Sequence, residues 1–239
     1  MGEAERIIEE YARRAAEIPP GRYDPTSRAE LLMQQSKERA AVDLLRRVEM
    51  LPLGGRRVLE VGCGEGGWLP RFESWGARRA DLAGIDLLEA DIERARLRLA
   101  PVRGDDGAVV EPGADLRVGD AARLPWEDAS HDIVVQSTVF SSILDPGMRR
   151  AVAAEMTRVL APGGAVLWFD FFVDNPRNRN VKGVRRPEIE ALFPGLRLVT
   201  RRVILAPPLT RLLARASWVA VEALESVRLL NTHYMAVLQ

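Results

Sequence analysis

The chain has 239 residues, 47% of them hydrophobic, and its 34 basic and 34 acidic residues give a formal net charge of zero. A chain of this length can bury one large α/β core, but its charge balance gives no overall field that would gather nucleic acid. The single cysteine, Cys63, excludes a disulfide framework and a multi-cysteine zinc site. Because the sequence has no long apolar stretch and no signal-peptide layout, we expect a cytoplasmic protein without integral membrane association or a nucleic-acid partner.

The first 50 residues are expected to form two helices that precede the main domain. Apolar side chains fall on one stripe over residues 3–17, and prolines at 19, 20 and 25 separate this helix from the next. Ser27 followed by Glu30 has the capping-box spacing that begins a helix. Open α/β sites need a cover that excludes water, so we interpret residues 1–50 as a helical lid and residues 51–239 as the main domain.

Residues 58–67 read Val-Leu-Glu-Val-Gly-Cys-Gly-Glu-Gly-Gly and predict a buried strand, a turn and a helix N-terminus. Gly62, Gly64 and Gly66 lack a Cβ, so backbone N–H groups of the turn can approach a ligand closely. Glu60 lies at the strand end, where it can face a cationic or hydroxyl-rich ligand. Asp86 ends the next apolar run, at the spacing typical of an acid that binds ribose hydroxyls. These features predict a nucleoside cofactor.

The glycine turn alone does not identify that cofactor. Gly62, Gly64 and Gly67 also satisfy the G-x-G-x-x-G pattern of dinucleotide-binding folds. From 56 to 172, strand-like runs alternate with helical ones, which predicts parallel strands with crossover helices and a ligand at the carboxyl ends of the strands. Residues 196–205 and 233–238 are expected to be the last two strands.

Five motifs in this order resemble the class I S-adenosylmethionine-dependent methyltransferases, in particular small-molecule enzymes similar to the methyltransferase-11 group. The motifs are Glu60–Gly66, Asp86, Gly119–Ala121, Leu124–Ser137 and Leu160–Phe169. The resemblance implies an α/β fold: a doubly wound, Rossmann-like sheet of seven mostly parallel strands with an antiparallel last strand and helices on both faces. It covers a cofactor-binding core at 56–172.

The same resemblance implies S-adenosyl-L-methionine as cofactor and S-adenosyl-L-homocysteine as product. It implies that the cofactor is bound by Arg39, Glu60, Gly62, Cys63, Gly64, Gly66, Asp86, Leu87, Asp120, Ala121 and Gln136. In similar enzymes an arginine that precedes the first motif by about the offset of Arg39 from Glu60 reaches the carboxylate of the cofactor. We predict no metal, because no set of clustered carboxylates accompanies Asp170 and Asp174.

The expected reaction is transfer of a methyl group to an oxygen or nitrogen of a small acceptor by in-line displacement, which depends mainly on positioning. A general base is needed only if the acceptor must lose a proton, and the candidates are Asp170, Ser141 and His233. The loop at 174–187 carries five cationic side chains, which suit an anionic, saccharide-like or natural-product acceptor, although a solvated loop explains them equally well. The candidate substrate-binding residues are Tyr11, Tyr23, Phe140, Arg177 and Arg179.

Apolar residues at helical spacing over 209–230 predict one helix inserted before the last strand. We expect this helix to dock on its own sheet or on a second copy, as in a homodimer. Trp218 and the neighbouring arginines would suit a membrane surface, but Glu222 and Glu225 argue against that interpretation.

Three alternative functions remain open from the sequence. A nicotinamide dehydrogenase would use the same glycine turn, and a non-catalytic interaction protein would bind the cofactor without turnover. A nucleic-acid methyltransferase is a further alternative that the charge balance disfavours.

Overall fold

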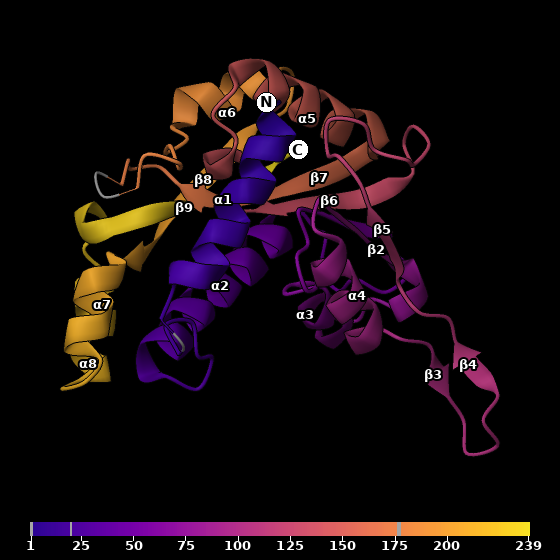
Figure 1. Cartoon of the computed structure of the whole chain (residues 1–239), viewed down its shortest axis with the longest axis horizontal. Coiled ribbons are helices and arrows are strands. Elements are labelled where there is room, and N and C mark those ends of the chain that lie inside the picture. Colours follow the sequence, from indigo (N-terminus) through magenta and orange to yellow (C-terminus); the bar gives the residue numbers. More distant parts are fainter. Residues whose placement is uncertain (1, 20, 176–177) are drawn as a thin grey trace.

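The computed structural model describes residues 2–19, 21–175 and 178–239, and a seven-stranded sheet lies at its centre (Figure 1). The five parallel strands β5, β2, β1, β6 and β7 are followed by β9 and β8, and β9 is antiparallel to both of its neighbours. In that order the strands are Asp115–Val118, Leu82–Asp86, Val58–Val61, His131–Ser137, Leu160–Phe171, Asn231–Leu238 and Leu198–Leu205. The predicted fold class, including the antiparallel last strand, is confirmed.

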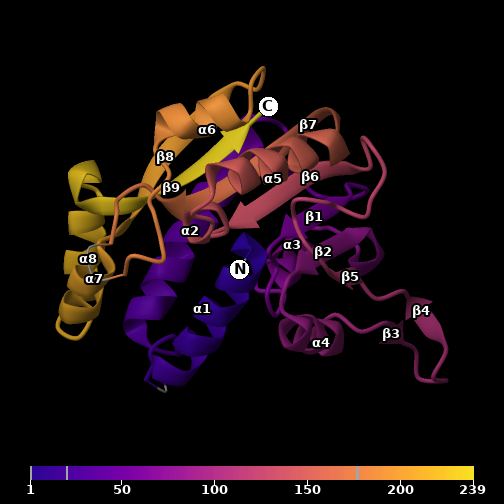
Figure 2. The same cartoon turned by 45° about the horizontal axis from the view of Figure 1, so that its top comes forward.

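Helices cover both faces of this sheet, because side chains of its buried strands alternate between two hydrophobic clusters. On β6, Ile133 and Val135 belong to one cluster and Val134 to the other. The first cluster packs against α2 (Arg28–Arg47), α3 (Leu69–Ser74) and α4 (Glu89–Arg98). The second packs against α5 (Pro146–Val159) and α6 (Arg186–Leu192), which lie on the other face (Figure 2).

The first N-terminal helix has the predicted bounds, and the second begins where the sequence predicts. Helix α1 spans Glu3–Glu17, and α2 begins after Ser27, whose hydroxyl accepts a hydrogen bond of 3.3 Å from the Glu30 N–H. Helix α1 packs against the α5 face through Ile7, whereas α2 is buried against the opposite face. The two helices therefore lie on opposite faces of the sheet.

The prediction of one helix over 209–230 is wrong. The segment forms α7 (Pro207–Leu213), α8 (Trp218–Glu225) and a 3-10 turn, η3 (Arg228–Leu230). Helix α8 begins afresh because the Ser217 hydroxyl accepts a hydrogen bond of 3.2 Å from the Ala220 N–H. The two short helices form a hairpin, because the Ala206 N–H donates to the Leu230 carbonyl at its base. We call residues 207–230 the α7–α8 hairpin.

A second hairpin, which the sequence did not suggest, projects from the opposite end of the sheet (Figure 1). It consists of β3 (Val102–Arg103) and β4 (Val109–Glu111). Two further 3-10 turns, η1 (Arg79–Asp81) and η2 (Phe140–Ser142), precede β2 and follow β6. Within the described residues, no helix is both long and apolar enough to cross a membrane.

Candidate functional site

A cavity of about 330 Å³ lies at the carboxyl ends of β1, β2, β5 and β6. Parallel α/β sheets bind ligands at this edge, where the loops after neighbouring strands converge. Of the predicted cofactor-binding residues, the cavity is lined by Glu60, Gly62, Cys63, Gly64, Asp86, Leu87, Asp120 and Ala121. Arg39, Gly66 and Gln136 are not among its lining residues.

The glycine turn has the close packing that the sequence predicts. Gly62 has φ +66°, and a Cβ there would lie 2.4 Å from Cγ2 of Val139 in the segment that follows β6. Gly66 instead faces α4, where a Cβ would lie 3.3 Å from Leu99 Cδ1. Gly67 takes its place in the cavity wall. Only a residue without a side chain fits between β1 and the Val139 segment.

Asp86 at the end of β2 both holds the turn and faces the cavity. Its two carboxylate oxygens accept backbone hydrogen bonds of 2.8 Å from Gly64 and 3.0 Å from Leu88. Burial raises the pKa of Asp86 above its usual value. A carboxylate has about four lone-pair positions, so Asp86 can still accept hydrogen bonds from two ligand hydroxyls.

Two buried polar atoms in the cavity wall, one on Glu60 and one on Trp68, have no hydrogen-bond partner among the described residues. Glu60 is 2% exposed and its Oε2 atom makes no hydrogen bond, and Nε1 of Trp68 is equally unpaired. Burial raises the pKa of Glu60 to about 8. A buried acceptor and a buried donor left open cost free energy unless a ligand pairs with them. Both groups therefore indicate a polar ligand.

Lys37 supplies a cation to the same part of the cavity, which the sequence analysis did not predict. Its ammonium lies 5.1 Å from the ring centroid of Trp68 and 4.6 Å from that of Phe169. Burial lowers the pKa of Lys37 to about 8, although the Glu60 carboxylate counteracts this shift. Arg39 lies elsewhere, because its guanidinium is 3.3 Å from Glu222 and lines a different cleft.

These side chains fit the groups of an adenosyl amino acid. Lys37 and the Trp68 N–H can donate to a carboxylate, and Glu60 can accept from an ammonium group. Asp86 has acceptor capacity for ribose hydroxyls. Among the described residues, no group of three or more His, Cys, Asp or Glu could hold a metal ion.

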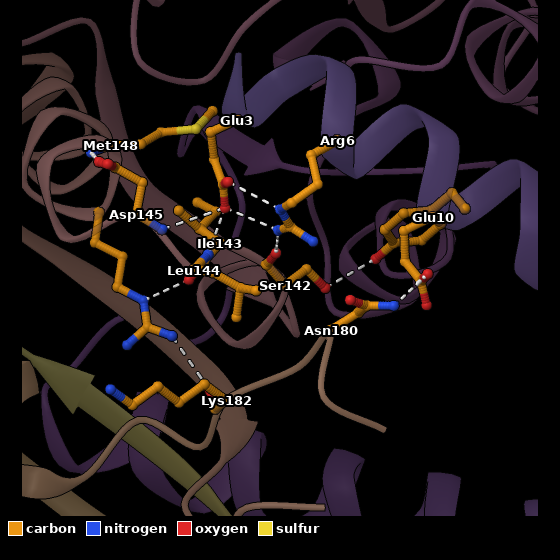
Figure 3. A network of polar contacts seen from close by, with 12 residues as sticks. Glu3, Arg6, Glu10, Ser142, Ile143, Leu144, Asp145, Met148, Asn180 and Lys182 are labelled. Carbon is orange, nitrogen blue, oxygen red and sulfur yellow. Dashed lines mark hydrogen bonds and ion pairs between the residues drawn. The ribbon is translucent and has the colours of Figure 1, made fainter. Parts of the chain in front are cut away.

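Helix α1 closes one side of the cavity through a polar network (Figure 3). The Glu3 carboxylate accepts hydrogen bonds from the Leu144 and Asp145 N–H groups, and Arg6 donates to Glu3 and, at 2.6 Å, to the Ser142 carbonyl. Hydrogen bonding to Arg6, chiefly, holds the pKa of Glu3 at about 2. Tyr11 on the same helix lies 3.2 Å from the Ser142 hydroxyl and lines the cavity.

Two of the candidate bases, Asp170 and Ser141, lie outside the cavity wall and are hydrogen-bonded to each other. Asp170 is fully buried and accepts hydrogen bonds from the Ser141 N–H at 3.0 Å and the Phe171 N–H at 2.8 Å. Burial raises the pKa of Asp170 to about 6. Gln136 has a similar role. Its side-chain N–H donates to the Phe169 carbonyl, and its side-chain oxygen accepts from the Val139 N–H. These residues therefore hold backbone segments next to the cavity in place without lining it.

His233, the third candidate base, is buried in an aromatic stack. Its ring lies parallel to Phe169 at 5.1 Å, and burial lowers its pKa to about 3. The unfolded imidazole titrates near 6.5, so its contribution to stability is present above that pH and is lost as the pH falls toward 3. His233 is outside the cavity wall.

We therefore predict that His233→Gln makes the free energy of unfolding less sensitive to acid. Between pH 6.5 and 5 the wild-type protein should lose about 2 kcal/mol more stability than the variant, from the linkage of this one group. Urea denaturation of both proteins across this range checks it. A difference that stays constant with pH would mean that folding does not lower the pKa of His233.

The candidate substrate residues separate in the structure. Tyr11 lines the cavity, but Tyr23 is 55% exposed away from it and Phe140 is buried against Trp168. Arg179 is exposed and lies outside the cavity wall, and Arg177 falls outside the described residues. Of the rest of the basic loop, Arg185 and Arg186 line other clefts. The lining residues that were not predicted from the sequence include Ile7, Gln34, Lys37, Trp68, Thr138, Ser142, Ile143 and Met148.

Comparison with known sequences points to one family. A family model for a methyltransferase domain matches residues 58–164. The phthiotriol/phenolphthiotriol dimycocerosates methyltransferase of Mycobacterium tuberculosis is 35% identical over 155 residues, which cover 64% of this chain and 52% of that protein. The 27-O-demethylrifamycin SV methyltransferase of Amycolatopsis mediterranei is 35% identical over 125 residues, covering 52% of this chain and 42% of the relative. The chain spans about half the length of the curated relatives it matches.

Solved structures show the same fold at low sequence identity. The PH0226 protein of Pyrococcus horikoshii has a TM-score of 0.58 and 20% identity, covering 96% of this chain and 98% of its own. The [4+2]-cyclase SpnF has a TM-score of 0.60 and 18% identity, covering 86% and 82%. The matched model, the named relatives and the strand order agree with the motifs in the sequence. Residues 58–164 therefore match a methyltransferase domain in sequence, within a fold that solved structures share.

Proposed function

We propose that this protein transfers a methyl group from S-adenosyl-L-methionine to a hydroxyl oxygen of a small natural-product acceptor. The observation that carries the proposal is one cavity lined by the unpaired Glu60 Oε2 and Trp68 Nε1 atoms together with Lys37 and Asp86. The names of two relatives, which refer to phthiotriol dimycocerosates and to a 27-O-demethylrifamycin, support a natural-product acceptor and, for the second, oxygen as the methylated atom.

Each of these groups has a role in holding the cofactor. Lys37 and the Trp68 N–H would bind the carboxylate of its amino-acid end, and Glu60 its ammonium group. Asp86 would accept hydrogen bonds from the ribose hydroxyls, while Asp120 and Ala121 would line the adenine position. When bound, the cofactor supplies a methyl group that is already activated by the sulfonium.

The remaining task of the protein is to position the acceptor and exclude water. Alignment of two reactants in this way can contribute roughly 7–11 kcal/mol to catalysis. Ile7, Ile143 and Met148 provide an apolar wall near α1, and Tyr11 and Ser142 provide hydroxyls that can orient the acceptor. Neither hydroxyl is a strong base at neutral pH. We therefore expect an acceptor oxygen that is acidic by its own chemistry, such as a phenol.

Binding of the product S-adenosyl-L-homocysteine tests this proposal. We predict that Asp86→Ala weakens its affinity by tenfold or more, because two hydroxyl acceptors are lost and the Gly64 N–H loses its partner. Isothermal titration calorimetry measures the effect, and circular dichroism confirms that the variant folds. Asp106→Ala is the matched control, since Asp106 accepts only a local hydrogen bond from Ala108 in the β3–β4 hairpin. Equal affinity of wild type and Asp86→Ala would contradict the assignment.

Methyl transfer needs its own test, because the fold alone is shared with proteins named for other reactions, such as the [4+2]-cyclase. Incubation with methyl-labelled cofactor and a panel of phenolic and polyhydroxylated natural products should label an acceptor. A thermal-shift comparison with NAD distinguishes the dehydrogenase alternative, since we expect S-adenosyl-L-homocysteine to stabilise the protein and NAD to leave it unchanged.

A further inference from the structure

The α7–α8 hairpin exposes an unusual share of apolar surface. Fourteen large hydrophobic side chains are exposed among the described residues, and six of them lie within this hairpin: Leu209, Leu212, Trp218, Val219, Val227 and Leu229. Leu229 is 83% exposed, Leu212 66% and Trp218 65%. The hairpin forms the outer edge of the molecule beside β8 and β9 (Figure 1). Apolar side chains gathered at such an edge indicate an interaction surface.

The charged side chains on the hairpin differ in whether they have partners within the protein. Glu222 and Glu225 turn toward α2, where Glu222 pairs with Arg39 and Glu225 accepts a hydrogen bond from the Ser36 hydroxyl. Arg215 and Arg228 are exposed and form no ion pair within the described part of the chain. Both glutamates therefore have partners within the protein and share the guanidinium of Arg39, whereas two arginines remain available.

A cleft of about 1000 Å³ between α2, β8 and the hairpin extends this cationic surface. Six arginines line it, namely Arg39, Arg47, Arg186, Arg201, Arg202 and Arg228, against three acids, Asp43, Glu222 and Glu225. Asn231 also lines it, is 3% exposed, and has an Oδ1 atom without a hydrogen-bond partner among the described residues. Arg39, Arg186 and Arg201 pair with acids of the protein, so the donors that the cleft offers to an anion are Arg47, Arg202 and Arg228. Asn231 offers a buried acceptor for a hydroxyl group.

We propose that the α7–α8 hairpin docks on an anionic lipid bilayer surface. Trp218, Leu212 and Leu229 would enter the interfacial region, where indole and aliphatic side chains are favoured. Arg215 and Arg228 would lie at the level of the phosphates, and the cleft would receive a head group. A second copy of the chain is a poorer occupant, because a self-complementary contact would bring the same unpaired arginines together.

Vesicle sedimentation tests this inference with the full chain. We expect binding to vesicles of equal parts phosphatidylcholine and phosphatidylglycerol, at least tenfold weaker binding to pure phosphatidylcholine, and loss of binding as salt is raised. Leu212→Ser with Leu229→Ser should reduce binding to the anionic vesicles at least fivefold, and Arg215→Gln with Arg228→Gln should do the same. All four side chains are exposed, so we expect the variants to keep the wild-type circular dichroism spectrum.

Matched controls come from elsewhere on the surface. Leu97 on α4 is 81% exposed, and Arg150 on α5 is exposed without an ion pair in the described residues, so Leu97→Ser and Arg150→Gln should bind vesicles like wild type. Equal binding to neutral and anionic vesicles, or none to either, would overturn the proposal. So would a dimer in sedimentation velocity that dissociates on Leu212→Ser with Leu229→Ser, because the hairpin would then be covered by a second copy.

Discussion

Replacing Lys37 by methionine should weaken the binding of S-adenosyl-L-homocysteine about 100-fold. Lys37 is the cation in the cavity wall that can pair with the carboxylate of the ligand, and its ammonium lies over the rings of Trp68 and Phe169. Truncating one partner of a buried charge pair costs roughly 2–5 kcal/mol, and 100-fold corresponds to about 3 kcal/mol. Methionine keeps the length and apolar stem of lysine, so packing is largely preserved. Isothermal titration calorimetry measures the loss.

Two controls separate this role from a general effect on the cavity. The compound 5′-methylthioadenosine lacks the amino-acid end, so its affinity should be nearly the same for wild type and Lys37→Met. Arg39→Met should bind S-adenosyl-L-homocysteine like wild type, because Arg39 faces Glu222 in the other cleft. If Lys37→Met weakened both compounds equally, or if Arg39→Met gave the larger loss, the carboxylate would be bound elsewhere.

Replacing Arg149 by methionine should destabilise the fold by about 3 kcal/mol, the cost typical of breaking a buried charged network. Arg149 is 3% exposed on α5 and donates hydrogen bonds to the Ile143 carbonyl at 2.7 Å and the Lys182 carbonyl at 3.3 Å. It also pairs with Glu188 on α6. Methionine would leave these acceptors unpaired. For a chain of this size the midpoint of thermal unfolding should fall by roughly 10 °C.

Arg150→Met is the matched control for this prediction. Arg150 is the next residue of the same helix, but its side chain is exposed, so its replacement should change the unfolding midpoint by no more than a degree or two. Calorimetric scans of both variants are sufficient. Equal midpoints for Arg149→Met and wild type would show that the Ile143 and Lys182 segments do not depend on this guanidinium.

The core of the fold could be predicted from local patterns because each pattern has a direct physical cause. Apolar runs without alternation become strands buried on both faces, and Ser27 begins α2 because its hydroxyl satisfies a backbone N–H. The turn after β1 needs positive φ at Gly62 and Gly64 and space beside Val139, which glycine alone provides cheaply. Asp86 follows from the length of one strand–helix–strand unit.

The errors concern positions that depend on which way a helix faces. Lys37 and Arg39 are two residues apart, so they point roughly 200° apart around α2, and only one of them can face the cavity. A family offset could not decide between them without the packing of α2 on β8 and β9. The continuous helix over 209–230 failed for another reason. Its apolar spacing persists through a turn that Ser217 caps, without a glycine or proline to mark the break.

The candidate bases lie outside the cavity wall, which the sequence could not indicate because a strand end has two sides. Asp170 and Gln136 lie at the carboxyl edge, as predicted, but their side chains bond to backbone groups behind the cavity. The sequence places a residue at the edge without stating which layer its side chain enters. The side chains of Asp170 and Gln136 enter the layer that contains Ser141 and Val139. There they pair with the backbone N–H groups of these two residues, which would otherwise lack partners.

The most direct test is a crystal structure of the protein with S-adenosyl-L-homocysteine. We predict electron density for the compound at the carboxyl ends of β1, β2 and β6, with its ribose hydroxyls on Asp86 and its carboxylate within hydrogen-bonding distance of Lys37. Density in another cleft, or a carboxylate directed away from Lys37 and the Trp68 N–H, would contradict the proposed site.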